Sequence, residues 1–230
     1  MYVSYGDAYR TPHVYDLKIN NLKDFKAQKT KTYELGLKDV IGNTAISSAI
    51  FMTETKDEIY YEKYHGTNEK AESKNFDGEV RRVGAELSLQ HYFDKLTLRE
   101  NVSYIQPKVT SGIHDGNEFA GVSRWQANVG ATYNITRNWD INGDAYYRGE
   151  RYSQDDFSNL YSKDDSVITV DVSTTYSFDT GLIIYGGVRN LFDETYYNTT
   201  TINQSANTKD EKNYYPANGR SVYAGFRYNF

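Results

Sequence analysis

Apolar and polar residues alternate along most of the chain. In residues 168–178, isoleucine, valine and aromatic residues occupy most even positions, whereas threonine, aspartate and serine occupy the odd positions. Residues 220–230 show the same alternation, with valine, alanine, phenylalanine and tyrosine on one parity. A β-strand places alternate residues on opposite faces. Both segments are therefore predicted to be strands with one apolar face and one polar face.

The alternation predicts further strands along the chain. The predicted ranges are 1–9, 31–38, 44–53, 83–93, 96–104, 125–133, 139–147, 168–178, 182–188 and 220–230. The facing of residues 44–53 stays open, because both parities of this segment carry apolar residues. Tight turns such as Ile41-Gly42-Asn43 follow every second strand, and long polar loops follow the others.

This order of connections predicts the fold class. Outer-membrane β-barrels have strands of about ten residues, short periplasmic turns and long extracellular loops. We therefore predict an all-β protein, an antiparallel transmembrane β-barrel of meander strands, whose apolar face meets lipid and whose polar face lines the lumen. A soluble sandwich or propeller also has alternating strands, but it does not explain the regular change between short and long connections.

Composition supports a membrane barrel and excludes several other classes. The 230 residues include 23 tyrosines, and 15% of the chain is aromatic, yet the mean hydropathy is −0.75. Aromatic girdles around a polar lumen produce this combination. A net charge of −5 argues against nucleic-acid binding. The absence of cysteine excludes disulfides and thiolate metal sites, and the sequence has no apolar run of 18 residues for a transmembrane helix.

Several segments resemble, in the same order, sequence boxes of the carboxy-terminal barrel of TonB-dependent outer-membrane receptors. They are residues 2–12, 29–38, 82–87, 188–196 and 214–220; the fourth, VRNLFDETY, is similar to the family's N-L-F-D-x-x-Y box. In the second segment, Lys29 stands where the family usually has glutamate. The positions that carry the resemblance are Arg10, Pro12, Glu34, Gly36, Gly84, Glu86, Asn190, Leu191, Phe192, Asp193, Tyr215, Pro216, Gly219, Arg220 and the terminal Phe230.

The resemblance implies a domain assignment, a location and partners. Residues 1–230 are expected to be the carboxy-terminal portion of a 22-stranded barrel in the bacterial outer membrane, without the plug domain or the TonB-contacting segment. No leader precedes residues 2–5, which favours a fragment of a longer precursor. The implied partners are outer-membrane lipid, the assembly machinery through the strand that ends at Phe230, and TonB and the plug only in a full-length receptor.

The family imports scarce nutrients and is not enzymatic, so the resemblance implies TonB-dependent uptake, for which a ferric siderophore is our leading ligand. No resident cofactor or metal is expected. Ferric siderophores are often flat anions, which tyrosine and arginine bind by stacking and charge-assisted hydrogen bonds. The candidate residues in predicted loops are Arg10, Tyr15, Tyr61, Tyr64, Arg151, Tyr152, Tyr161, Tyr197 and Tyr214. For each tyrosine, packing within a loop or a girdle is the alternative.

Other ligands and activities stay open at this point. Haem is the alternative ligand, because His13, His65 and His114 lie in predicted loops, and a neutral imidazole ligates haem iron. A ten-stranded outer-membrane protease would need paired acids beside a histidine, but the acidic pairs at 155–156 and 164–165 share a loop without one. A passive porin-like channel is a further alternative, and the family boxes argue against it.

Overall fold

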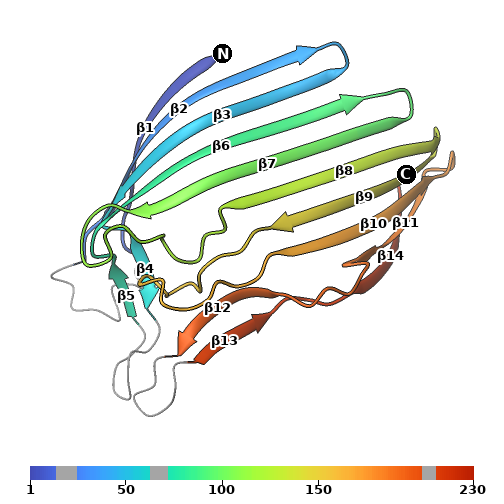
Figure 1. Ribbon diagram of the computed structural model, residues 1–230. Coiled ribbons are helices and arrows are strands. Elements are labelled where there is room, and N and C mark those ends of the chain that lie inside the picture. The colour runs from blue at the N-terminus through green and yellow to red at the C-terminus, as the bar shows by residue number, and fades with distance from the viewer. Residues whose placement is uncertain (14–24, 63–71, 204–210) are drawn as a thin grey trace.

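The computed structural model describes residues 1–13, 25–62, 72–203 and 211–230. Its main element is an antiparallel sheet of ten strands in chain order (Figure 1). The strands are β1 (Tyr2–Arg10), β2 (Gln28–Ile41), β3 (Thr44–Lys56), β6 (Glu79–Tyr92), β7 (Leu96–Val109), β8 (Trp125–Thr136), β9 (Trp139–Arg148), β10 (Val167–Ser177), β11 (Leu182–Arg189) and β14 (Ser221–Tyr228). The sheet is curved into an open trough, and among the described strands β1 and β14 are its edges.

The connections separate into two kinds at the two ends of the sheet. Four tight turns join β2 to β3, β6 to β7, β8 to β9 and β10 to β11 at one end (Figure 1). Gly42 and Gly181 occupy two of these turns with φ of +61° and +88°, a backbone region that favours glycine. The long connections lie at the opposite end. The predicted all-β antiparallel fold, with alternating short and long connections, is thereby confirmed.

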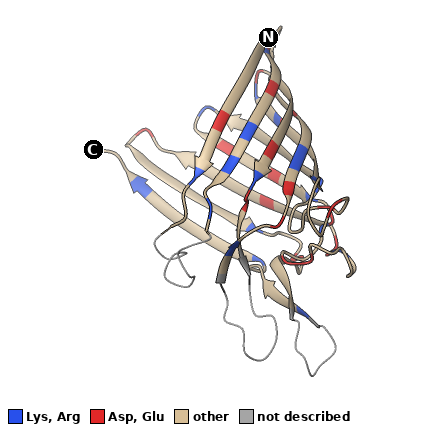
Figure 2. Cartoon of the chain, turned by 90° about the vertical axis from the view of Figure 1, so that its left-hand side faces the viewer, with Lys and Arg blue, Asp and Glu red and all other residues tan. Residues whose placement is uncertain are grey.

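The strand register separates a polar concave face from an apolar convex face. Val172 lies opposite Val188 on β11 and Gly143 on β9. Its neighbour Asp171 has the other parity and lines a cleft of about 980 Å³ on the concave side. Figure 2 shows residues of both charge signs along the strands. Within the described part of the chain, no helix is long and apolar enough to cross a membrane.

The register also settles the facing of β3. Ile50 lies opposite Leu35 on β2 and Ala85 on β6, so the parity of Ile50 belongs to the convex face. Phe51 therefore points to the concave face, where it lies opposite Gly84. A Cβ atom on Gly84 would overlap the Phe51 ring, so the glycine leaves room for an aromatic side chain from the neighbouring strand.

Four short strands lie in connections that the sequence predicted to be loops. β4 (Ile59–Glu62) pairs with β5 (Glu72–Asn75), and β12 (Tyr197–Asn203) pairs with β13 (Glu211–Pro216). The prediction of loops without strands was wrong at these positions, because the strands are short and their many polar residues hide the alternation. The prediction also ended β7 too early, because this strand continues to Val109, past its predicted end at 104.

Candidate functional site

The concave face forms a polar wall whose side chains pair across neighbouring strands. The Tyr2 hydroxyl donates to Glu34 over 2.7 Å. Arg99 donates to the Thr132 hydroxyl over 2.9 Å and lies 3.5 Å from the Asp144 carboxylate. The charged residues that line the large cleft are Glu34, Lys38, Glu86, Arg148, Asp171 and Arg189. This wall can contact a polar ligand or a polar domain inside the trough.

An aromatic cluster packs at the long-loop end of the wall. Phe76, Phe119 and Phe157 come from three different connections, and their ring centroids lie 4.8–5.1 Å apart. Val80 and Val109, at the loop ends of β6 and β7, belong to the same cluster and are fully buried. Buried aromatic side chains contribute the largest apolar areas to a core. The cluster therefore holds three long connections in one arrangement.

Hydrogen bonds fix the β12–β13 hairpin to the β9–β10 connection. The Gln154 amide donates to the Thr200 carbonyl over 2.9 Å. The Asp155 carboxylate accepts from the Ile202 amide over 2.8 Å, and Lys212 lies 3.2 Å from the Asp164 carboxylate. Asp155 and Asp164, which belong to the two acidic pairs considered for a protease site, therefore hold the loops together.

A second cleft, of about 570 Å³, opens beside the aromatic cluster. Arg10, the last residue of β1, and Arg151, in the β9–β10 connection, both line it. Tyr60 of β4 and the cluster residues Phe119 and Phe157 supply aromatic surface to the same lining. Two cationic side chains from distant parts of the sequence thus meet around one aromatic recess.

The carboxylate at this cleft is neutralised by an arginine. Among the described lining residues Glu58 is the only acid, and Arg82 donates to both of its oxygens over 2.7 and 2.9 Å. The Arg82 guanidinium also lies 4.9 Å from the centre of the Phe119 ring. Because Glu58 is paired with Arg82, the net positive charge at the cleft comes from Arg10 and Arg151.

Arg151 is held partly buried at the edge of this cleft. It donates to the Asn198 carbonyl over 2.6 Å, and its Nε atom lies 4.0 Å from the Asp164 carboxylate. Burial, followed by the nearby Arg148 charge, lowers the pKa of Arg151 from its ordinary value. A guanidinium remains protonated in proteins, and the one carboxylate beside Arg151, Asp164, also pairs with Lys212, so a second anion at the cleft would be favourable.

The predicted ligand-binding tyrosines are not gathered at this cleft. Tyr152 packs against the aromatic cluster, with the Lys163 ammonium 4.9 Å from its ring centre. Tyr197 and Tyr214 contact each other across the β12–β13 hairpin, with ring centroids 4.6 Å apart. Tyr161 is half-buried, and its backbone amide donates to Asp156 over 3.0 Å. Tyr61 lies in β4, whereas Tyr15, Tyr64 and His65 lie outside the described residues.

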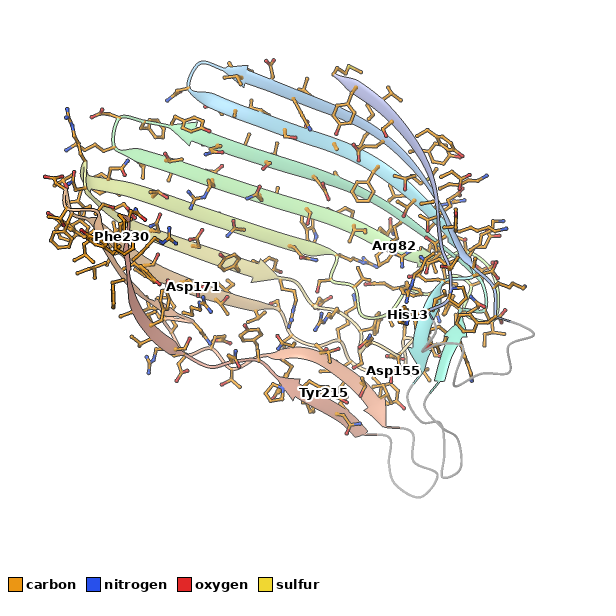
Figure 3. All side chains as sticks on the ribbon, turned by 180° about the vertical axis from the view of Figure 1, so that it is seen from behind. His13, Arg82, Asp155, Asp171, Tyr215 and Phe230 are labelled. Atoms are coloured by element: carbon orange, nitrogen blue, oxygen red, sulfur yellow. The ribbon has the colours of Figure 1, made fainter. Side chains whose placement is uncertain are left out.

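Two of the histidines predicted as haem ligands can be placed. His114 stacks on Phe76, with ring centroids 5.9 Å apart and an interplanar angle of 22°. Its Nδ1 atom lies 3.4 Å from the Ser158 hydroxyl. His13 is exposed just beyond β1. Figure 3 places His13, Arg82 and Asp155 at the long-loop end of the sheet and Phe230 at the tight-turn end.

Sequence reasoning missed the aromatic residues of the cleft. Tyr60, Phe119 and Phe157 line it, and each lies in a predicted loop outside any alternating segment. The sequence shows large apolar residues in these loops, but it does not show which of them pack together. The Glu58–Arg82 pair was likewise missed, because its partners are 24 residues apart and meet only through strand pairing.

The N-L-F-D box forms a folded turn between β11 and the last strand. Asn190 and Asp193 have φ of +50° and +58°. The Asn190 amide group donates to the Glu194 carbonyl and accepts from the Glu194 amide, both over 2.8 Å. The Asp193 carboxylate accepts from the Arg220 amide over 2.8 Å, at the start of β14. Two of the resembling boxes therefore bind each other and set where β14 begins.

Three further box positions have structural roles in the strands. Gly36 lies opposite Tyr2, and a Cβ atom there would overlap the Tyr2 ring, as at Gly84. Pro216 pairs with Tyr197 in the β12–β13 hairpin. The Phe230 ring packs edge-on against Tyr228, with centroids 5.2 Å apart. Among the described residues there is no group of three or more acidic, histidine or cysteine side chains that could hold a metal ion.

Comparison with known proteins identifies the family. A family model described as "TonB dependent receptor-like, beta-barrel" matches residues 1–191. The ferric yersiniabactin uptake receptor FyuA from Yersinia pestis is 23% identical, with a TM-score of 0.76 over 99% of this chain and 34% of that chain. The siderophore receptor PiuA from Acinetobacter baumannii is 20% identical, with a TM-score of 0.73 over 98% of this chain and 33% of that chain.

The copper transporter OprC is also similar, at 18% identity and a TM-score of 0.77 over 99% of this chain and 36% of that chain. The chain therefore spans about a third of the length of these solved proteins. The family's members are outer-membrane transporters and not enzymes. With its family match over residues 1–191 and an open antiparallel sheet that superposes on part of solved receptor barrels, the chain belongs to the TonB-dependent receptor β-barrel family of the bacterial outer membrane.

Proposed function

We propose that this chain supplies the part of a TonB-dependent receptor barrel that captures a ferric siderophore at the long-loop end. The observation that carries the proposal is the cleft of about 570 Å³ in which Arg10 and Arg151 meet Tyr60, Phe119 and Phe157. Its volume falls in the range of about 300–1,000 Å³ that is usual for small-molecule sites.

The chemistry of the lining fits an anionic, flat ligand. Arginine forms bidentate, charge-assisted hydrogen bonds with carboxylate and catecholate oxygens and also stacks on planar groups. The aromatic rings offer apolar surface for the flat part of such a ligand. Two of the similar structures are a ferric yersiniabactin uptake receptor and a siderophore receptor, which supports the same ligand class.

The positions of the histidines give haem less support. One face of the His114 ring stacks on Phe76, and its Nδ1 atom lies near Ser158, so the imidazole is part of the loop packing. In the complete receptor, we propose that captured ligand crosses the membrane in a step that depends on TonB and a plug domain. Assembly of the barrel through the strand that ends at Phe230 belongs to the same proposal.

Ligand binding to the detergent-solubilised chain tests the capture step. Quenching of tryptophan fluorescence would be titrated with ferric hydroxamate, ferric catecholate, ferric citrate, haemin and copper(II). We expect one of the ferric siderophores to bind most tightly. Each of the substitutions Arg10→Gln and Arg151→Gln should weaken that binding by a factor of about 10 to 100, and the double variant by about 100 to 10,000, because each charge-assisted hydrogen bond contributes about 1.5–3 kcal/mol.

Arg137→Gln is the matched control. Arg137 is an exposed arginine in the β8–β9 turn, at the end of the sheet opposite the cleft. Its substitution should leave the affinity unchanged. Tightest binding of haemin or copper(II), or equal affinity of the double variant and the unsubstituted chain, would overturn the proposal.

A further inference from the structure

Glu58 and Arg82 form an ion pair beside the cleft of the proposed function. Glu58 is the one acid among the described residues that line this cleft, and Arg82 is not part of the lining. The Arg82 Nη2 atom donates to both Glu58 oxygens over 2.7 and 2.9 Å, and both side chains are 17% exposed. The Arg82 guanidinium also lies 4.9 Å from the centre of the Phe119 ring, which lines the cleft. Arg82 therefore lies directly behind the wall of the cleft, with its charge balanced by Glu58.

The backbone on both sides of this pair holds it in place. The Glu58 carbonyl accepts from the Phe76 amide over 2.7 Å, and the next amide, that of Ile59, donates to the Gln28 side chain over 3.1 Å. Arg82 belongs to β6, which pairs with a strand on each side. The pair is therefore a fixed part of the molecule, unlike an exposed ion pair between two freely moving side chains.

The pair changes the charge that an anionic ligand meets in the cleft. Arg10 and Arg151 are the cations of the lining, and both attract an anion. Glu58 repels the same anion, and it also occupies the Nη2 atom of a third guanidinium. An unpaired Arg82 would add a third positive charge behind the wall. Because the Coulomb energy is proportional to the charge of the ligand, Glu58 lowers the affinity most for the most highly charged ligands.

We propose that Glu58 determines the charge selectivity of the cleft, an inference that rests on the proposed function. Binding sites commonly reach specificity by adding a repulsive group against the wrong ligand. One carboxylate beside two attractive arginines favours ferric complexes of low negative charge over trianionic complexes. Glu58 is a specificity residue and is not required for binding, so its removal strengthens the binding of one class of ligand.

The test titrates the detergent-solubilised chain with two ferric complexes of different charge, by quenching of tryptophan fluorescence. The probes are a neutral ferric trihydroxamate and a trianionic ferric tricatecholate. Glu58→Gln removes one negative charge. At a distance of about 8 Å and an effective dielectric constant of about 60, this changes the affinity about threefold for each charge of the ligand. We therefore expect the variant to bind the tricatecholate about 30-fold more tightly and the trihydroxamate with unchanged affinity.

Two further variants separate charge from structure. The double substitution Glu58→Gln and Arg82→Gln removes one charge of each sign, so the preference between the two probes should return to that of the unsubstituted chain. Glu54→Gln is the matched control, because Glu54 forms an ion pair with Arg81 over 2.8 Å. Glu54 has the parity of Ile50 and lies on the convex face. Its substitution should leave the affinity for both probes unchanged.

The charge dependence decides the outcome. The proposal is overturned if Glu58→Gln leaves the affinity for the tricatecholate unchanged or changes the affinity for both probes equally. It is also overturned if the double variant binds the tricatecholate as tightly as Glu58→Gln does. Circular dichroism checks that each variant keeps its strands. If Glu58→Gln loses strand signal, Arg82→Gln decides the result, because it should weaken only the binding of the tricatecholate, and equal weakening of both probes would contradict the proposal.

The same titration distinguishes this inference from the proposed function. If no ferric siderophore binds to the unsubstituted chain, the proposed function fails and the selectivity of Glu58 fails with it. If a ferric siderophore binds and Glu58→Gln does not change the preference between the probes, only the selectivity inference fails.

Discussion

Gly84 has no side chain, and this leaves room for an aromatic ring on the concave face. A Cβ atom at this position would overlap the Phe51 ring and lie 2.6 Å from the Tyr104 carbonyl oxygen. We expect Gly84→Ala to lower the free energy of unfolding by about 1–3 kcal/mol, the usual cost of overpacking. Gly143 on β9 is the matched control, because a Cβ there would meet nothing within 4 Å.

Urea unfolding in detergent would measure both variants. Gly143→Ala should be neutral or stabilise the sheet by up to about 1 kcal/mol, because alanine reduces the freedom of the unfolded chain. Equal destabilisation by the two substitutions would contradict the packing role of Gly84.

Val172 and Ser173 test the two faces of β10 at adjacent residues. Val172 is on the convex face, whereas Ser173 lies opposite Asn142 on the concave face. Arginine at Val172 should cost about 2–4 kcal/mol if this position is near the membrane midplane. Arginine at Ser173 should cost much less, because the polar wall solvates it. Urea unfolding in lipid vesicles compares the two, and equal costs would refute the assigned faces.

At the scale of elements, the turn built by Asn190 couples β11 to β14. Asn190 is 5% exposed, so its amide hydrogen bonds are shielded from water. Asn190→Gly keeps the positive φ but loses these hydrogen bonds, and should cost about 1–2 kcal/mol. Asn190→Ala adds backbone strain and should cost about 1 kcal/mol more. Thermal unfolding of both variants checks the order, and alanine tolerated as well as glycine would exclude strain at this position.

The elements differ in how well the sequence predicts them. The period-two pattern predicted β10 and β14, because one face of each is mainly apolar. It missed β4 and β12, which lie outside the main sheet, because β4 has only four residues and β12 consists mainly of threonine and asparagine. Of the residues that line the candidate cleft, the sequence predicted only Arg10 and Arg151. Both are cationic residues in predicted loops, which is the residue type that an anionic ligand requires. The ring packing that brings Phe119 and Phe157 together depends on tertiary contacts between loops, which no local pattern encodes.

For the whole molecule, the open sheet limits what these 230 residues can do alone. β1 and β14 expose one backbone edge each, along nine and eight residues. Each unpaired amide or carbonyl costs several kcal/mol in lipid, so both edges must pair before the sheet can span a membrane. If the ten strands closed on themselves, inner side chains such as Tyr146 and Tyr185 would fill the narrow lumen.

We therefore expect no TonB-dependent uptake from this chain by itself. It would be secreted behind a signal peptide in a strain without ferric-siderophore receptors, and accumulation of labelled ferric siderophore would be measured with and without TonB. A closed small barrel lacks a lumen wide enough for the ligand, and an open sheet lacks a stable membrane-spanning state, so accumulation should stay at background in both strains. A complete ferric-siderophore receptor in the same strain confirms that the assay works. Equal accumulation with and without TonB would show that the edges pair into a wider, passive barrel, as a second copy of the chain would allow, whereas TonB-dependent accumulation from the chain alone would contradict the expectation outright.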